Sequence, residues 1–551
     1  MTTLVKFILA HDADRRKDLT ILAVLFGLVF FLFLGHIPLI DPDEGRYAEI
    51  PREMLERGDF ITPFLNYVKY FEKPVLLYWL NALSFGIFGQ NEFAARFPSA
   101  LSGLLTVLLT YVTGREIFSR RVGMMAALIL GTSVGFLVQA RYNITDMILT
   151  FCMTATLACF IMAAKAEGRR QGRYYYLMYF FAALTVLAKG LIGIVLPVMV
   201  IFGYILLSRR WSIFREMRLL TGTILFILVA APWFVLVSLK NPEFARFFFI
   251  HEHFERFLTK VHKRYEPPWF FIPVLVGCML PWSFFIPSGV LLGWRERRAD
   301  AGALLYLALW VVLIFGFFSV SSSKLIPYIL PVFPAVALLI GWAFSIVADR
   351  PGRIFTGAVA VLGVVLCIMG AGLIAYPWAV AEPDLTRDVC LVGGVLLALE
   401  GVVLLGGWKR WKAGTLFMTL ALFSLAIEVA VPPMILYHFA EKRSAKGLGA
   451  IVNTVIKPGA VLAGIVYDHS LSFYTGQRVV IVGGKGELEF GSEQGDNREW
   501  FIDWPRFLEL WNGPRQVLFV VEKDLLPLLQ GSLGRFTTLG GNEKKYLITN
   551  Q

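Results

Sequence analysis

Apolar runs long enough to cross a membrane recur along this chain at short intervals. A helix needs roughly 17–25 mostly apolar residues to cross the hydrocarbon core of a bilayer, and most of these runs have that length. The strands of an outer-membrane barrel would instead alternate apolar and polar residues, which these runs do not do. Only 17% of the residues are charged, against about 25% in a typical soluble protein. The pattern predicts an α-helical protein that crosses the membrane many times.

The net charge of +12 comes from short basic clusters between the apolar runs. Such clusters mark the cytoplasmic ends of membrane helices, whereas a nucleic-acid-binding protein gathers its basic residues on one surface. We therefore exclude a nucleic-acid partner and use the clusters to count crossings. They are Arg115/Arg120/Arg121, Lys165/Arg169/Arg170/Arg173, Arg209/Arg210/Arg215/Arg218, Arg295/Arg297/Arg298, Arg350/Arg353 and Lys409/Arg410/Lys412.

With a cytoplasmic N-terminus, the clusters predict about thirteen crossings and a C-terminus on the outer side. The first run follows Arg15, Arg16 and Lys17 and has no cleavage site near its end, so it is predicted to remain as an uncleaved span. Residues 75–89 are apolar but no basic cluster follows them, which predicts a membrane-dipping or juxtamembrane helix, or the top of a bent second span. The predicted crossings are 19–40, 93–114, 122–140, 145–164, 173–188, 190–208, 219–238, 270–293, 303–320, 326–347, 354–377, 390–407 and 413–432.

The sequence changes character from about Tyr437 onward. Short runs typical of strands appear at Val461–Tyr467, Val479–Val482 and Gln516–Val521, with helical stretches and glycine-containing turns between them. Strands that alternate with helices predict a small α/β domain. We therefore predict a transmembrane domain over 1–436, with outer loops 41–92 and 239–269, and an outer α/β domain over 437–551.

The first outer loop carries charged residues directly after the first span. Asp41, Asp43, Glu44 and Arg46 stand at its start. Residues 44–55 have the spacing of an amphipathic helix, which we predict to lie along the water–lipid interface. Charges next to apolar segments are costly unless they serve a function, so this loop is a candidate site.

Three further outward positions are charged. Asp146 begins a predicted span, Lys189 interrupts an apolar stretch where two spans turn, and Lys324 lies in a similar turn. One such residue alone would be explained by a side chain that reaches the interface or by a structural ion pair. Because all three face the outer side, we predict that they share one polar cavity with the first loop.

The loop 239–269 contains His251, His253 and His262 among acidic and basic residues. This pattern allows a metal site but lacks the pair of histidines four residues apart that helical zinc proteases use. It is equally typical of a cationic, pH-sensitive loop that suits an anionic lipid headgroup. Both readings stay open at this point.

Carboxylates beside lysine and arginine suit group transfer from a lipid-phosphate donor. Basic side chains bind a phosphate and stabilise its charge as it leaves, and a carboxylate orders or deprotonates the acceptor. The sequence has no Gly-rich phosphate loop and no dinucleotide fingerprint, so no nucleotide cofactor is predicted. A transporter is the alternative, although transporter sites lie near the middle of the bilayer and often in internal repeats.

The sequence resembles the membrane glycosyltransferases of the GT-C fold, and within them the bacterial lipid A 4-amino-4-deoxy-L-arabinose transferases, which are related to protein O-mannosyltransferases. The resemblance covers the whole chain. It implies an inverting transfer from undecaprenyl phosphate to a lipid A phosphate on the periplasmic face of the inner membrane, which gives resistance to polymyxin and cationic antimicrobial peptides. The stretches that carry it are DPDEGRYAEIPREML, YFEKPVLLYW, NITDMIL, LAKGLIG, FFFIHEHFERF and SSSKLIPYILP.

The resemblance also implies roles for individual residues. Asp43 is the expected catalytic carboxylate, with Lys73 and Asp146 also in the catalytic set, and Glu72 with His253 would hold a divalent ion, zinc, in a structural role. A lipid A phosphate is already ionised near neutral pH, so Asp43 acts either as a base or as a group that orients the donor amine. The residues expected to contact the donor phosphate are Arg46, Lys73, Lys189, Arg256, Lys324 and Tyr328.

Two alternatives to this function remain open from the sequence. One is another polyprenyl-phosphate-sugar transferase, acting on protein hydroxyls as protein O-mannosyltransferases do, for which a true base is needed. The other is a transporter or flippase of polyprenyl lipid. In all readings membrane lipids surround the protein, and we predict a monomer.

Overall fold

The computed structural model describes residues 14–551 except 256–265, 296–299, 348–351 and 381–384. The chain forms two compact units, which are described separately. The first comprises Met1–Leu32, Ser99–Val235 and Ala245–Ile435, and the second comprises Phe33–Pro98, Leu236–Phe244 and Leu436–Gln551.

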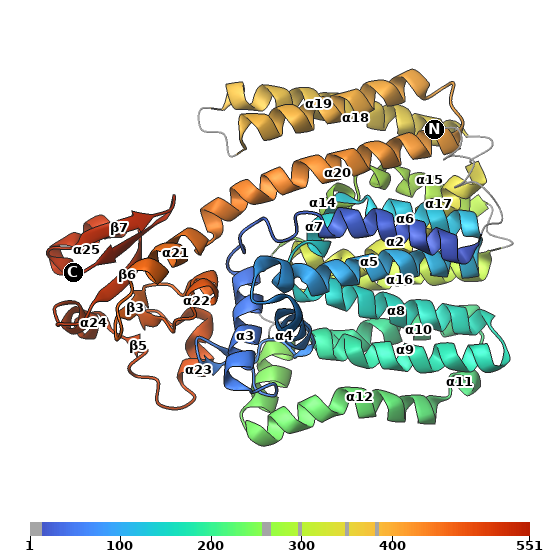
Figure 1. Ribbon diagram of the computed structural model, residues 1–551. Coiled ribbons are helices and arrows are strands. Elements are labelled where there is room, and N and C mark those ends of the chain that lie inside the picture. The colour runs from blue at the N-terminus through green and yellow to red at the C-terminus, as the bar shows by residue number, and fades with distance from the viewer. Residues whose placement is uncertain (1–13, 256–265, 296–299, 348–351, 381–384) are drawn as a thin grey trace. The chain divides into compact units, whose positions relative to one another are not determined.

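The first unit consists of helices packed side by side (Figure 1). Three helices, α5, α12 and α20, continue from it into the second unit. The elements are α2 (Arg15–Phe31), α5 (Glu92–Ile117), α6 (Arg120–Gly131), α7 (Val134–Ala140), α8 (Thr145–Lys165), α9 (Gly168–Lys189), α10 (Ile192–Ser208), α11 (Ile213–Glu216), α12 (Leu219–Lys240), η1 (Arg246–Glu255), α14 (Phe271–Cys278), η2 (Trp282–Phe285), α15 (Ile286–Arg295), α16 (Ala301–Val320), η3 (Ile326–Val332), α17 (Phe333–Val347), α18 (Arg353–Ala379), α19 (Arg387–Gly407) and α20 (Ala413–Arg443).

Eight described helices are long and apolar enough to cross a membrane, and ten spans result if each of two bent helix pairs counts as one. All of them coincide with predicted crossings. The three remaining predicted crossings are also helical. Of these, α2 and α10 have 17 residues each, and α9 begins with a segment that contains Arg169, Arg170 and Arg173. The predicted helical positions are therefore confirmed except at the first crossing, where α2 ends at Phe31 and residues 32–40 of the predicted span 19–40 are not helical. The fold is that of a polytopic membrane protein.

The two bent pairs meet through a hydrogen bond. The α6–α7 pair bends by 69° at Thr132 and Ser133, and the second pair, from α14 to η2 and α15, bends by 109°. Trp282 Nε1, at the second bend, lies 3.0 Å from Thr132 Oγ1, to which it donates. This contact gives the polar atoms at each break a partner inside the bundle, where no water is available to them.

A buried ion pair joins α2 to α6. Asp18 is fully buried, and its carboxylate accepts hydrogen bonds from Arg120 Nη2 at 2.7 Å and from the Tyr111 hydroxyl of α5 at 2.5 Å. A charge at this depth requires paired and hydrogen-bonded partners. The pair therefore specifies how these three helices associate.

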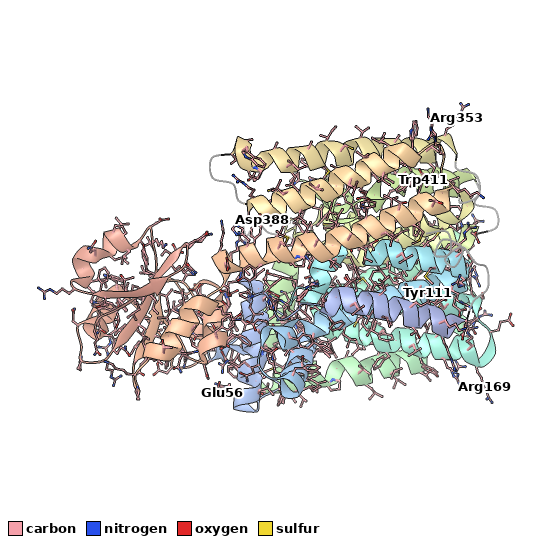
Figure 2. All side chains as sticks on the ribbon, turned by 45° about the horizontal axis from the view of Figure 1, so that its top comes forward. Glu56, Tyr111, Arg169, Arg353, Asp388 and Trp411 are labelled. Carbon is pink, nitrogen blue, oxygen red and sulfur yellow. The ribbon has the colours of Figure 1, made fainter. Side chains whose placement is uncertain are left out.

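Helices α18 and α19 run in opposite directions on either side of the return loop predicted near residues 377–388. Figure 2 shows Arg169 and Arg353 at one end of the helical unit and Asp388 at the opposite end. Arg353 begins α18 and Asp388 follows one residue after the start of α19, so the two helices form an antiparallel hairpin. This is the arrangement that a positive cluster followed by an outer return loop predicts.

The second unit contains the first outer loop and the C-terminal residues. Its six-stranded sheet has the order β5-β4-β3-β6-β8-β7, in which β3 is parallel to β4 and β6, β4 is parallel to β5, and β8 is antiparallel to β6 and β7. The elements are α3 (Asp43–Arg57), β1 (Phe64–Leu65), β2 (Val68–Lys69), α4 (Leu76–Phe88), α21 (Lys446–Val455), β3 (Val461–Gly464), α22 (His469–Thr475), β4 (Val480–Val482), η4 (Gly486–Leu488), α23 (Glu489–Ser492), β5 (Phe501–Ile502), α24 (Trp504–Trp511), β6 (Val517–Glu522), α25 (Leu526–Leu533), β7 (Thr537–Gly541) and β8 (Lys545–Thr549).

The predicted α/β character of the C-terminal region is confirmed. Strands β3 and β4 lie within predicted runs, and β6 (Val517–Glu522) coincides with the third run but ends one residue later. Strands β5, β7 and β8 were not predicted. The core on this sheet includes Phe507, Trp511 and Phe519, all nearly inaccessible. Helix α4 occupies the ambiguous segment 75–89. Its 13 residues reach only about 20 Å, which is less than the roughly 30 Å of the hydrocarbon core.

The amphipathic helix predicted at residues 44–55 is present as α3, and its position along the interface stays a prediction, but its polar face is covered by protein. Glu44, Arg46, Glu49, Arg52 and Glu53 are all buried. Helix α3 packs against α4 and α22, and its charges are paired: Arg52 makes two 2.7 Å contacts with Glu49. An amphipathic pattern reports which face is polar but not whether that polar face meets water or other charges.

Candidate active site

The carboxylate of Asp43 stands at the first residue of α3. Its side chain is 41% exposed, whereas that of Arg46, one turn later, is 10% exposed. Arg46 Nη1 lies 3.1 Å from Asp43 Oδ1, and Arg46 Nη2 lies 2.7 Å from Glu487 Oε2. The guanidinium is thus held between a carboxylate of the first outer loop and one of the C-terminal region.

Glu487 is a residue that the sequence reasoning missed. It lies in η4, a single short turn, and shares a hydrogen bond with His469 Nε2 at the start of α22. Burial raises the pKa of Glu487 to about 7, against the opposing charge of Arg46. Burial, with the nearby charges of Arg46 and Lys545, lowers the pKa of His469 well below its usual value, so the imidazole is neutral.

Glu487 gave no local signal in the sequence because it is one acid in a glycine-containing turn, Gly483-Gly484-Lys485-Gly486. Only the packing of α22 on the first outer loop brings it to Arg46. That packing is apolar: Phe473 of α22 lies in one cluster with Leu39, Ala48 and Phe85. The contact of this turn with Arg46, near the other end of the chain, could not be inferred from spacing along the sequence.

Several polar atoms around Arg46 are buried without a hydrogen-bond partner in the described part of the chain. They are Arg46 Nε and the hydroxyls of Tyr70 and Tyr78. Burial raises the pKa of both tyrosines well above the usual value, so each hydroxyl carries its proton. Buried polar groups in native structures are almost always satisfied, and an exception calls for an explanation such as a bound ligand.

Glu72 and Lys73 precede α4 in the same unit. Lys73 Nζ donates to the carbonyl oxygen of Glu72 at 2.9 Å. The Glu72 carboxylate acts electrostatically on both Arg46 and Glu487. The structure therefore brings Asp43, Arg46 and Glu72 into one charged environment.

A second charged cluster lies within the helical unit. Asp146, in the first turn of α8, forms an ion pair with Lys189, the last residue of α9. Lys189 Nζ also lies 4.6 Å from the centre of the Tyr328 ring, a distance at which a cation is attracted to the ring face. Three of the residues singled out in the sequence are thus neighbours, although 182 residues separate Asp146 from Tyr328.

Lys324 is held by backbone carbonyl oxygens, and Glu266 acts on it electrostatically. Its Nζ donates to the carbonyl oxygens of Ser321 at 2.6 Å and of Glu266 at 2.8 Å. Carbonyl oxygens hold the ammonium in position without cancelling its charge. That this residue and the other two clusters line a single cavity remains a prediction.

The metal prediction rests partly on residues outside the described set. The side chain of His253, a predicted metal ligand, lies outside the described residues, as does Arg256, which was predicted to contact the donor phosphate. Among the residues that are described, no group of three or more His, Cys, Asp or Glu side chains could hold a metal ion. Glu72 alone supplies one carboxylate, which is too few donors for a structural zinc site of four ligands.

Two family descriptions match parts of the chain. Residues 22–248 match the dolichyl-phosphate-mannose-protein mannosyltransferase family, and residues 448–550 match the aminoarabinose transferase C-terminal domain. The first match contains Asp43, Arg46 and Lys73, and the second contains Glu487 and His469. The cluster around Arg46 is thus assembled from both matched regions.

Similar proteins span nearly the whole chain. An undecaprenyl phosphate-α-4-amino-4-deoxy-L-arabinose arabinosyl transferase of Proteus mirabilis is 33% identical over 75% of this chain and 76% of its own length. One of Erwinia tasmaniensis is 30% identical over 88% and 90%. The crystal structure of ArnT from Cupriavidus metallidurans bound to undecaprenyl phosphate matches with a TM-score of 0.85 and 29% identity, over 97% of this chain and 98% of that one.

Proposed function

Because this chain belongs to the family of undecaprenyl phosphate-α-4-amino-4-deoxy-L-arabinose arabinosyl transferases, we propose that it moves 4-amino-4-deoxy-L-arabinose from undecaprenyl phosphate to a phosphate of lipid A. It is a membrane glycosyltransferase with a lipid-linked donor. The transfer takes place on the periplasmic face of the inner membrane, with the N-terminus in the cytoplasm and the C-terminus in the periplasm.

The observation that carries this proposal is the environment of Arg46. A buried guanidinium whose Nε is unsatisfied stands beside two protonated tyrosine hydroxyls that also lack partners. The Arg46 Nε–H is a donor and each protonated hydroxyl can donate, and unused donors suit a phosphate, which offers several acceptor oxygens. Arg46 and Lys73 would bind the donor phosphate in this way.

In the proposed reaction, an oxygen of the acceptor phosphate attacks the anomeric carbon of the donor sugar. The bond from that carbon to the undecaprenyl-phosphate oxygen breaks, its electron pair stays on the leaving phosphate, and the configuration inverts. Arg46 and Lys73 stabilise the charge that develops on the leaving phosphate. No proton must be removed from an ionised phosphate, so Asp43 orients the donor by pairing with its amino group.

The second cluster would serve the same donor. Lys189, held by Asp146 and by the Tyr328 ring, contributes positive charge, and Lys324, positioned by the carbonyl oxygen of Ser321, contributes a second ammonium. Arg256 completes the proposed phosphate-binding set. Glu72 with His253 is proposed to hold a structural zinc ion, and no chemical step depends on it.

The proposed product carries an added amine on a phosphate and so loses negative charge. A less anionic lipid surface binds cationic peptides more weakly, which would give resistance to polymyxin. Mass spectrometry of lipid A from cells with and without the protein tests the function. Addition of one aminopentose to a phosphate supports it. Unchanged lipid A together with newly glycosylated proteins would instead establish the protein O-mannosyltransferase alternative.

A further inference from the structure

A pocket of about 340 Å³ lies in the second unit, behind the start of α3. Its walls come from the end of α20, the loop that precedes α22, and the turn between β7 and β8. Asp41 and Pro42, the two residues before Asp43, complete it. The volume falls in the range of pockets that hold small polar molecules, and none of the proposed donor-binding residues lines it.

Four basic residues line this pocket: Lys442, Arg443, Lys544 and Lys545. Lys545 is paired with Asp468, and Lys442 lies 3.4 Å from the exposed Glu543. Within the described ranges, Arg443 and Lys544 form no ion pair, and both are exposed. The pocket therefore presents cations that no carboxylate neutralises.

The acidic residues of the pocket offset this charge only in part. Asp468 is used by Lys545, and Glu522 lies exposed at the end of β6. Asp41 is buried and accepts hydrogen bonds from Ser470 N at 2.8 Å and from Ser470 Oγ at 2.5 Å. Burial and the nearby Asp468 raise the pKa of Asp41 to about 7, which weakens the negative charge that this carboxyl contributes to the pocket.

The pocket is lined by the end of a membrane helix, which favours a membrane lipid over a soluble anion as its ligand. Lys442 and Arg443 are the last residues of α20, whose 31 residues span about 46 Å. That length exceeds the roughly 30 Å of the hydrocarbon core and reaches through the headgroup layer. The pocket is thus lined by the last residues of this helix together with Asp41 and Pro42, the two residues before Asp43.

We infer that this pocket binds a phosphorylated sugar of the acceptor lipid through a phosphate other than the one that receives the aminoarabinose. The inference rests on the proposed function, because it assumes an acceptor with more than one phosphate. Arg443 and Lys544 contact that second phosphate, and Asn542 contacts the sugar. The pocket thereby sets which phosphate reaches the reaction centre.

The test uses the full-length protein in phosphatidylcholine nanodiscs and N-acetylglucosamine 1-phosphate as the probe. The variant is the double substitution Arg443→Gln and Lys544→Gln. The matched control is Lys457→Gln with Arg535→Gln, which removes the same charge from exposed positions of the same unit that do not line the pocket. Loss of two charge-assisted contacts is expected to weaken probe binding by about tenfold or more, and the control is expected to bind like the wild type.

Two comparisons identify the chemistry that is bound. N-acetylglucosamine without phosphate should not bind, and inorganic phosphate should bind more weakly than the phosphorylated sugar. Equal binding of inorganic phosphate would show an adventitious anion site and overturn the inference. Equal binding of the probe to the variant and the control, or no binding to the wild type, would overturn it as well.

Transfer kinetics separate this inference from the proposed function. With purified donor and lipid A, the double variant should raise the KM for the acceptor about tenfold and leave kcat and the KM for the donor unchanged. Absence of any transfer by the wild type would reject the proposed function, while the probe measurements would still decide the pocket. An unchanged acceptor KM in an active variant would reject the pocket alone.

Discussion

The ion pair between Glu44 and Arg96 offers a sharp test of how α3 is held in place. Arg96 Nε and Nη2 lie 2.7 and 2.6 Å from the two oxygens of Glu44. Arg96 also donates to the carbonyl oxygens of three residues that precede α3, namely Leu34, Ile37 and Pro38. The side chains are 3% and 0% exposed, so Glu44→Gln leaves a buried guanidinium without its counter-charge.

Removing one partner of a buried ion pair costs about 3–5 kcal/mol. For a domain of 150–250 residues, each kcal/mol shifts the melting temperature by about 2–4 °C, so we expect a decrease on the order of 10 °C. Differential scanning fluorimetry of the purified protein measures this shift. Because Glu44 follows Asp43 directly, transfer activity is expected to fall together with stability.

Two controls make this prediction specific. Glu92→Gln breaks the pair with Lys446, in which the lysine side chain is 49% exposed and the glutamate side chain 11% exposed, and solvent at the lysine makes such a pair weaker than a fully buried one. The double substitution Glu44→Met with Arg96→Met removes both charges and should recover most of the lost stability. If Glu44→Gln lowers the melting temperature no more than Glu92→Gln does, the proposed role of this pair is wrong.

Further predictions concern the reaction and its pH dependence. Asp43→Asn is expected to abolish transfer while binding of undecaprenyl phosphate, measured by native mass spectrometry, is retained. Lys73→Ala should weaken binding of the donor phosphate by about tenfold or more, because a charge-assisted contact is lost. Donor affinity should rise as the pH falls from 8 to 6, since protonated Glu487, with its pKa raised to about 7, releases Arg46, and Glu487→Gln should remove this dependence. His253→Ala is expected to lower the zinc content measured by elemental analysis.

Each of these predictions has a result that contradicts it. Full transfer by the Asp43 variant would reject its catalytic role, and unchanged donor affinity would reject Lys73 as a phosphate ligand. The raised pKa of Glu487 also fixes how folding stability depends on pH. The folded state holds this proton more tightly than the unfolded chain, so the free energy of unfolding decreases as the pH rises toward 7. A Glu487→Gln variant that keeps the wild-type pH profile, or an undiminished zinc content in the His253 variant, would refute those two assignments.

The local sequence pattern was sufficient to predict where most of the long helices lie. Apolar length and the placement of basic clusters predicted helices at α8, α16 and α18, because crossing the hydrocarbon core is a requirement on each segment separately. The strands β3, β4 and β6 were predicted for a similar reason, since their residues are buried in a continuous apolar run. The strands β5, β7 and β8 were missed, because short or edge strands carry weaker patterns than a buried central strand.

The sequence by itself determined that this chain is a helical membrane protein, that its charges gather in short segments between the apolar runs, and that Asp146 and Lys189 stand at helix ends. Only the tertiary structure decided which charges meet. Glu487 and His469 reach Arg46 because α22 packs its apolar face on α3 and α4, and such packing joins segments that no spacing along the chain relates. For the same reason the polar face of α3 is buried against paired charges rather than exposed to water.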